Sequence, residues 1–193
     1  MTFIGIDPGL RYMGIALVDG EHAETALFET RPDDGSEADR VQDLAQALHN
    51  WIGDRPNLYD TEETVVVGIE AEHFQQVRYK ANPTERDWKA EAAKAGSTLR
   101  VAQVAGAVMA VAATFGLRVV EVSPAEGKIA TTGNSAASKQ QVWEMVCKRF
   151  GLKRINYHQA DAVGVALGAE RIVKREKLEA LTGKERQEAE NGP

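Results

Sequence analysis

Short apolar runs alternate with longer stretches of helical periodicity along this chain of 193 residues. Apolar runs of this kind, bounded by Gly, Pro or acidic residues, are typical of strands. They predict five strands, over residues 3–7, 13–18, 23–29, 65–70 and 118–122. Asp19-Gly20 predicts a hairpin turn between the second and the third strand.

Apolar residues at helical spacing predict four helices, over about 37–52, 97–115, 138–150 and from Tyr157 to about 174. In the second helix, Val104 and Val108 share one stripe, while Leu99 makes another side apolar. This pattern indicates a helix that is buried on more than one side. Strands and helices mixed in a chain of this length predict a single α/β domain over residues 1–174.

Two segments have a different, mostly polar character. Residues 71–94 are polar, carry scattered aromatic residues and have little periodicity, so we expect a mobile or substrate-contacting loop. Residues 175–193 are almost entirely polar and charged, which is typical of a flexible C-terminal tail.

Composition narrows the class of protein. No continuous apolar run approaches the roughly 18 residues of a membrane span, and the N-terminus lacks the pattern of a signal peptide. The one cysteine, Cys147, excludes an internal disulfide and suits a reducing compartment. We therefore expect a cytoplasmic protein without a membrane segment.

The net charge of −6 conceals a basic region. Residues 78–154 hold 13 Lys and Arg against 6 Asp and Glu, whereas the rest of the chain holds 10 against 23. Phosphate binding requires such local positive charge, which a net charge can hide. Chance clustering on solvated helices is the alternative, and charge alone does not separate the two.

Three acidic residues stand at the ends of apolar elements. Asp7 ends the first strand, Glu70 ends the fourth, and Asp161 opens the apolar stripe of the last helix, three residues after His158. Burying an ionised carboxylate is costly unless a cation compensates, and helix positions i and i+3 share a face. Oxygen-rich pockets of this kind suit Mg²⁺, and two such ions can serve a phosphodiester displacement.

Each of these residues also has an ordinary structural explanation. Asp7 before Pro-Gly fits a turn, and Glu70 fits a solvated strand end. Asp161 fits the N-terminal dipole of a helix, and His158 fits a helix start or a core. Their combination within one α/β domain favours a shared metal site.

Three segments, taken in order, resemble the RuvC-type Holliday-junction resolvases. They are Ile4-Gly5-Ile6-Asp7-Pro8-Gly9 followed by Gly14, then Gly68-Ile69-Glu70, then His158-Gln159-Ala160-Asp161-Ala162 leading into Val165-Ala166-Leu167. The first segment alone also resembles sugar-kinase-like ATPases, but the order and spacing of all three favour the resolvases. The resemblance covers about residues 3–172, and some family members carry Asp where this chain has His158.

The resemblance implies a ribonuclease H-like α/β fold, with a mixed five-stranded sheet flanked by helices on both faces. It implies a catalytic and metal-binding set for two Mg²⁺ ions, with Mn²⁺ as a substitute, formed by Asp7, Glu70, His158 and Asp161. It implies DNA contacts by Lys128 and Lys139 at the scissile strand and by His73 or Phe74 at the junction centre. It also implies a homodimer through the helix at about 97–115.

The expected function is metal-dependent resolution of four-way DNA junctions by paired phosphodiester hydrolysis. The alternatives are a related nuclease acting on RNA–DNA hybrid or other branched DNA, and a module that binds branched DNA without cutting it. A sugar-kinase-like phosphotransferase would need a second phosphate loop and a second lobe, for which this chain is too short. Whether His158 binds metal or acts as general base stays open.

Two features depart from the family pattern. The stretch from Arg78 to Lys94 is longer than in typical members and contains Tyr79 and Trp88, which leaves the junction-centre contacts and the sequence preference open. The overall acidity predicts lower non-specific affinity for DNA.

Overall fold

The computed structural model describes residues 1–59, 64–71 and 85–190, and of residues 85–94 and 183–190 it describes the backbone alone. The elements are β1 (Thr2–Asp7), β2 (Tyr12–Asp19), β3 (His22–Glu29), η1 (Pro32–Asp34), α1 (Glu37–Gly53), η2 (Pro56–Leu58), β4 (Val65–Glu70), α2 (Glu85–Thr114), β5 (Arg118–Val122), α3 (Pro124–Thr132), α4 (Lys139–Phe150) and α5 (Tyr157–Glu190). The strands agree with the predicted ones to within one residue at each end.

The strands form one five-stranded sheet in the order β3-β2-β1-β4-β5. The first three strands form an antiparallel meander, in which β1 pairs with β2 and β2 pairs with β3. β4 pairs parallel to β1 and β5 parallel to β4. Parallel neighbours need a crossover connection, and α1 and α2 supply the two crossovers. The expected mixed sheet is confirmed.

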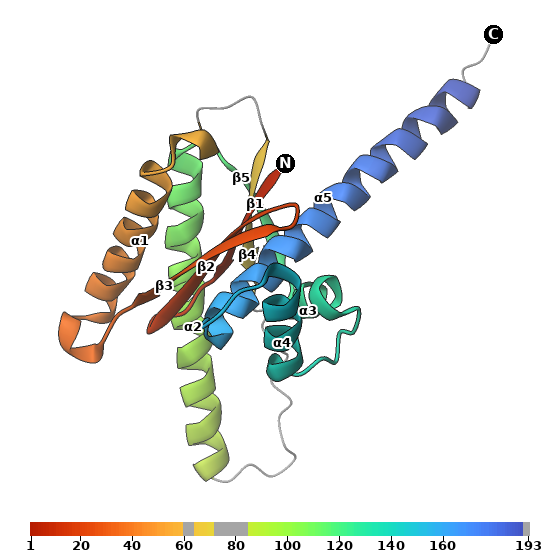
Figure 1. Ribbon diagram of the computed structural model, residues 1–193. Coiled ribbons are helices and arrows are strands. Elements are labelled where there is room, and N and C mark those ends of the chain that lie inside the picture. Colours follow the sequence, from red (N-terminus) through yellow and green to blue (C-terminus); the bar gives the residue numbers. More distant parts are fainter. Residues whose placement is uncertain (60–63, 72–84, 191–193) are drawn as a thin grey trace.

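Helices cover both faces of the sheet, as expected (Figure 1). On one face, α1 and α2 bury the β1 side chains Ile4 and Ile6 against Leu48 and Val108. On the other face, α3, α4 and α5 enclose Phe3 and Val66 together with the apolar side of α5. Alternate residues of a strand point to opposite faces, so β1 presents Phe3, Gly5 and Asp7 to the α5 side.

Helix α2 begins at Glu85, within the segment 71–94 for which the sequence predicted a loop. That prediction is wrong from Glu85 onward. Residues 85–94 are rich in Glu, Lys, Arg and Ala, which favour helix formation. They lack a repeating apolar stripe, and apolar periodicity is the signal on which the prediction depended.

Helix α5 continues to Glu190 instead of ending near Lys174. Its C-terminal part extends away from the sheet (Figure 1), and Leu178 and Leu181 are 63% and 60% exposed. The segment beyond Lys174 is rich in helix-forming residues, which explains the helix although few of them are apolar. The flexibility expected of residues 175–193 stays a prediction.

Helix α3 was not predicted from the sequence pattern. Ser123 caps it, because its hydroxyl accepts from the Glu126 backbone N–H while the Glu126 carboxylate accepts from the Ser123 backbone. Ser-Pro-x-Glu is the sequence of such a capping box with Pro at the first helical position. The signal was therefore present, although apolar periodicity over nine residues is too short to reveal it.

One part of α2, Ala95–Thr114, is long and apolar enough to cross a membrane, with a mean hydropathy of 1.3. By length and mean hydropathy, this stretch therefore differs from the expectation that no segment is apolar enough to span a membrane. Core helices of soluble proteins have the same length and hydropathy, so one such helix does not identify a membrane protein. Only 17% of the stretch is buried within the chain. The helix thus carries apolar surface that the rest of the described chain leaves uncovered.

Candidate active site

Two carboxylates reach the same edge of the sheet from neighbouring strands. Asp7 is the last residue of β1 and Glu70 the last of β4, and the parallel register pairs Ile6 with Ile69 one position earlier. Parallel strands in register end together, and their alternating side chains keep in phase. Asp7 and Glu70 therefore project side by side toward the face that α5 covers.

Helix α5 lies directly on this face because glycines leave room for its backbone. A Cβ on Gly5 would stand 2.0 Å from the Ala162 carbonyl oxygen, and one on Gly14 would stand 2.2 Å from the His158 carbonyl oxygen. Any other residue at either position would push the helix away. The two glycines thus set His158 and Asp161 within reach of the strand-end carboxylates.

The first turn of α5 is fixed in place by side-chain hydrogen bonds. The backbone N–H of Gln159 donates to the Asn156 side chain at 2.9 Å, and the Asn156 N–H donates to the Gln159 side chain at 3.0 Å. The Gln159 amide also donates to the Thr25 hydroxyl of β3 at 3.1 Å. This reciprocal cap satisfies free N–H groups of the helix start and ties the turn that carries His158 to the sheet.

The predicted acidic set meets through a chain of polar contacts. His158 Nδ1 lies 2.7 Å from Asp7 Oδ2, and Asp7 in turn shares a hydrogen bond with Glu70. On the other side, Lys139 Nζ donates to Asp161 Oδ2 at 3.1 Å. The structure therefore brings Asp7, Glu70, His158 and Asp161 together with Lys139, the first residue of α4.

Crowding of the carboxylates makes this cluster electrostatically strained. Burial, followed by the charge of Asp7 and a hydrogen bond with it, raises the pKa of Glu70 to about 8. Burial also raises the pKa of Asp161, although the Lys139 ammonium opposes this shift. Neighbouring carboxylates disfavour each other's ionised form, so the cluster favours any added positive charge.

The pKa values of the two basic residues of the cluster, His158 and Lys139, are raised as well. A hydrogen bond with Asp7 raises the pKa of His158 against the effect of its burial. Burial lowers the pKa of Lys139, but the attraction of Asp161, Asp7 and Glu70 outweighs it and the net shift is upward. Both groups therefore carry positive charge more readily here than in water.

A cavity of about 140 Å³ adjoins the acids and is lined by Glu70, Ser123, Pro124, Gly127, Lys128, Lys139, Val142, Asp161, Gly164 and Val165. Its walls come from the end of β4, the start of α3, the first half of α4 and the first turns of α5. Both lysines that the resemblance implies thus line the same cavity as two of the acids. An anionic group in this cavity would meet two ammonium groups beside the carboxylates.

The donor set fits a divalent cation in chemistry but not yet in geometry. The three carboxylates of Asp7, Glu70 and Asp161 supply the oxygen ligands and the charge that Mg²⁺ prefers, and the raised pKa values of Glu70 and Asp161 show that this site favours added positive charge. Within the described residues, however, no group of three His, Cys, Asp or Glu side chains is already arranged to hold one ion. Asp7 and Asp161 are engaged with His158 and Lys139, so these side chains would rotate toward an ion.

Two predicted residues and one residue that was not predicted remain to be placed relative to the site. His73 and Phe74 lie outside the described residues. Tyr12, which the sequence analysis did not consider, stacks on His158 with 5.4 Å between the ring centroids. Because Tyr12 stands two residues before Gly14 in β2, strand alternation assigns it to the same face, and this signal could have identified it.

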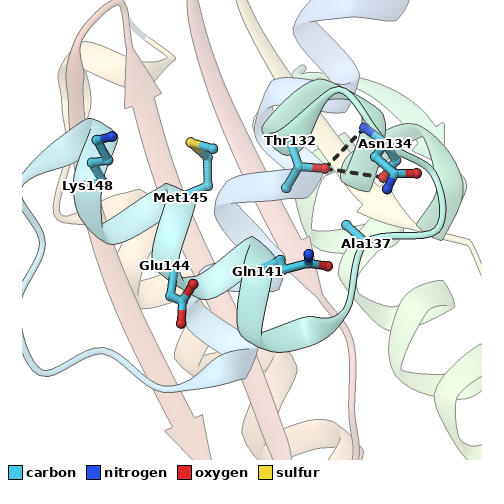
Figure 2. A pocket seen from close by; sticks show the side chains of 7 residues that line it. All are labelled: Thr132, Asn134, Ala137, Gln141, Glu144, Met145 and Lys148. Carbon is cyan, nitrogen blue, oxygen red and sulfur yellow. Dashed lines mark hydrogen bonds between the residues drawn. The ribbon is translucent and has the colours of Figure 1, made fainter.

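A larger cavity, of about 330 Å³, lies apart from the acids between the end of α3 and α4. Figure 2 shows its lining, where the Thr132 hydroxyl bonds with the backbone of Asn134. Neither the four predicted ligands nor Lys128 and Lys139 contribute to it. Size alone therefore does not identify the functional site, and the chemistry of the smaller cavity does.

Known proteins resemble this chain along most of its length. The family model described as crossover junction endodeoxyribonuclease RuvC matches residues 3–169. A crossover junction endodeoxyribonuclease RuvC of Mycobacterium avium is 29% identical, over 97% of this chain and 93% of that protein.

Two solved structures share the fold. Thermus thermophilus RuvC matches at 25% identity with a TM-score of 0.61, over 87% of this chain and 92% of that one. T. thermophilus RuvC in complex with Holliday junction substrate matches at 22% identity with a TM-score of 0.63, over 87% and 91% of the two chains. The expected ribonuclease H-like fold is thereby confirmed.

Proposed function

This chain belongs to the RuvC family of crossover junction endodeoxyribonucleases, and we propose that it resolves four-way DNA junctions with the help of Mg²⁺. The observation that carries the proposal is the cluster of Asp7, Glu70 and Asp161 beside a cavity with two lysines. A binding module would gain nothing from carboxylates that face phosphates. Hydrolysis of a phosphodiester, in contrast, uses carboxylates to hold cations and lysines to hold the phosphate.

Each residue has a role that follows from its place. Asp7 stands between Glu70 and His158, and these three residues would hold the metal ions together with Asp161. Bound ions of this kind activate a water molecule and stabilise the charge on the transferring phosphate. Lys128 and Lys139 would hold the scissile phosphate in the cavity, and Lys139, which donates to Asp161 in this structure, would donate to the phosphate oxygens instead.

The proposal is tested with end-labelled four-way junction, linear duplex and RNA–DNA hybrid, each with Mg²⁺ and with EDTA. We expect two symmetric nicks in the junction with Mg²⁺, the same with Mn²⁺, and little cutting of the linear duplex. Imidazole is a softer ligand than carboxylate, which supports activity with Mn²⁺. Preferred cutting of the hybrid would instead support the alternative nuclease, and junction binding without cutting in either metal would support the binding module.

The two cavity lysines are expected to affect cutting more than binding. Lys128→Ala and Lys139→Ala should each slow single-turnover cleavage about 100-fold, as the loss of one preorganised charge near a transferring phosphate does. Junction affinity should change little, because many other phosphates contribute to it. Lys148→Ala and Arg149→Ala are matched controls outside this cavity, and equal slowing by all four would mean a diffuse electrostatic surface.

We further propose a homodimer through α2, since this helix has two opposite apolar faces. Val104, Val108 and Ala112 are buried against α1 and the sheet. The opposite face is exposed and carries Leu99, Ala102, Gly106, Ala110 and Ala113, with Gln103 as a polar residue among them. Helix α4 does not cover this face, because it packs with α3 and α5 on the other side of the sheet.

Small residues on this face allow a second copy of α2 to approach closely, and a self-complementary patch gives a two-fold interface. A four-way junction has the same symmetry, so two sites would meet two equivalent strands. We expect a species of about twice the 21.0 kDa chain mass at micromolar concentration without DNA. Ala110→Glu should split it, while Ala180→Glu, on the exposed part of α5, should not.

Sedimentation velocity distinguishes the outcomes. A single species at the chain mass for the unmodified protein would overturn the dimer. The charge is placed at Ala110 and not at Val108, because Val108 is fully buried within the chain and a charge there would unfold the domain.

A further inference from the structure

The aromatic residue at the start of β2 makes a contact with the site that the proposed mechanism does not use. The rings of Tyr12 and His158 stack, with centroids 5.4 Å apart and an angle of 29° between their planes. The guanidinium of Arg11 lies over the Tyr12 ring, 5.1 Å from its centroid. Tyr12 therefore contacts both the imidazole of His158 and the guanidinium of Arg11.

The place of Tyr12 in the sheet explains this contact. Tyr12 and Gly14 share the face of β2 that α5 covers, and the His158 backbone passes so close to Gly14 that a Cβ would stand 2.2 Å from its carbonyl oxygen. The Tyr12 ring therefore lies beside the first turn of α5. Backbone pairing with Glu29 of β3 holds this end of β2 in register, so the ring is presented from a rigid element.

His158 needs such support, because its side chain is more exposed than those of Asp7 and Asp161. Its side chain is 37% exposed, against 12% for Asp7 and 19% for Asp161. One hydrogen bond, from Nδ1 to Asp7 at 2.7 Å, fixes one end of the ring. An ionised Asp7 only accepts, so Nδ1 donates and the neutral ring keeps its lone pair on Nε2. A single hydrogen bond still permits the ring plane to turn, and stacking on Tyr12 restricts that rotation.

We propose that Tyr12 is a positioning residue for His158, and that Arg11 steadies it. By fixing the plane of the imidazole while Asp7 fixes Nδ1, Tyr12 presents the ring ready to bind an ion at the carboxylates. The inference rests on the proposed function, in which His158 is a metal ligand. It concerns orientation alone, since within the described residues the Tyr12 hydroxyl makes no hydrogen bond and the ring is what contacts His158.

The first test measures Mn²⁺ binding to the full chain by calorimetry. Tyr12→Ala should weaken binding about tenfold, the scale found when a residue that orients a metal ligand is lost. Tyr12→Phe keeps the ring and should stay within about twofold. Tyr157→Ala is the matched control, because Tyr157 is adjacent to His158 in the chain but its hydroxyl bonds with Gln140 instead.

The second test asks whether Tyr12 acts through His158. In a His158→Asp background, where a carboxylate replaces the imidazole, Tyr12→Ala should have almost no effect on Mn²⁺ affinity. The His158 ring protons give an independent reading, because stacking on Tyr12 shifts their NMR resonances upfield and Tyr12→Ala should remove that shift. Tyr12→Phe should preserve it.

Failure of the inference and failure of the proposed function look different. If the unmodified chain binds no Mn²⁺, the metal site is wrong and the role of Tyr12 falls with it. If the chain binds Mn²⁺ and Tyr12→Ala binds it equally well, only the inference is overturned. Equal weakening in the native and His158→Asp backgrounds would also overturn it, since Tyr12 would then act on the fold or on DNA.

Discussion

Asp7→Asn is expected to abolish junction cleavage, by at least about 1000-fold, while junction binding persists. Asp7 is buried at the end of β1 and contacts both His158 and Glu70, so it is the shared member of the cluster. A neutral amide cannot supply the charge that holds cations near a phosphate. A 1000-fold loss corresponds to about 4 kcal/mol of transition-state stabilisation, which is the scale of a lost preorganised electrostatic group.

Binding should persist because phosphate contacts made by basic residues dominate affinity for DNA. Removing one negative charge near the phosphates should, if anything, tighten it. The amide of Asn retains an oxygen that accepts from His158 Nδ1, so the fold around α5 should be kept. Glu70→Gln and Asp161→Asn should show the same separation of binding from cutting.

Single-turnover cleavage and fluorescence anisotropy with labelled junction measure the two properties. Asp19→Asn, at the exposed end of β2, is a matched control that should cleave normally. Near-normal cleavage by Asp7→Asn would show that the catalytic centre has been assigned to the wrong residues.

Glu70→Gln is expected to make the protein more stable than the native sequence at alkaline pH. The pKa of Glu70 is about 8 in the folded chain against an ordinary value of 4.5. Between these values the folded chain keeps a proton that the unfolded chain releases. Stability from this proton is fully present below about pH 4.5 and is lost as the pH rises through about 8.

The pKa shift of Glu70 sets an upper limit on the change in the free energy of unfolding. A shift of this extent corresponds to at most about 5 kcal/mol, and we expect a difference of a few kcal/mol. Gln is uncharged throughout, so the native and Glu70→Gln proteins should have similar stability near pH 5. The variant should be the more stable of the two at pH 8.5. Burial raises the pKa of Asp161 as well, and this carboxyl is present in both proteins.

Urea unfolding in EDTA between pH 5 and 9 gives the measurement. Glu21→Gln, at an exposed turn, is the control and should follow the native curve at every pH. A stability difference between Glu70→Gln and the native chain that does not change with pH would contradict the assigned burial of the Glu70 charge. Added Mg²⁺ should restore stability to the native chain at pH 8.5 but not to the variant, since binding to the folded state stabilises it.

The sequence by itself determined the helices and strands whose residues alternate regularly between buried and exposed positions. The strand ends at Asp7 and Glu70 could be placed because apolar runs stop there on a carboxylate. The helix that carries Asp161 could be placed because an apolar stripe at helical spacing follows it. The spacing of apolar residues in a strand or a helix is a local property of the sequence. It indicates which face of the element is buried, but not which other element packs against that face. Where the period is absent, as in residues 85–94, the same method predicted a loop and missed a helix.

The tertiary structure decided which of these local features meet. His158 and Asp7 are separated by 151 positions and lie 2.7 Å apart, because Gly5 and Gly14 let α5 rest on the sheet. The stack of Tyr12 on His158 and the contact of Lys139 with Asp161 arise from the same packing. The exposure of one apolar face of α2 also arises from this packing. The sequence shows that this helix has more than one apolar side, but it does not show which of these sides the rest of the chain covers. Contacts between distant segments depend on how whole layers pack, and no local period in the sequence encodes them.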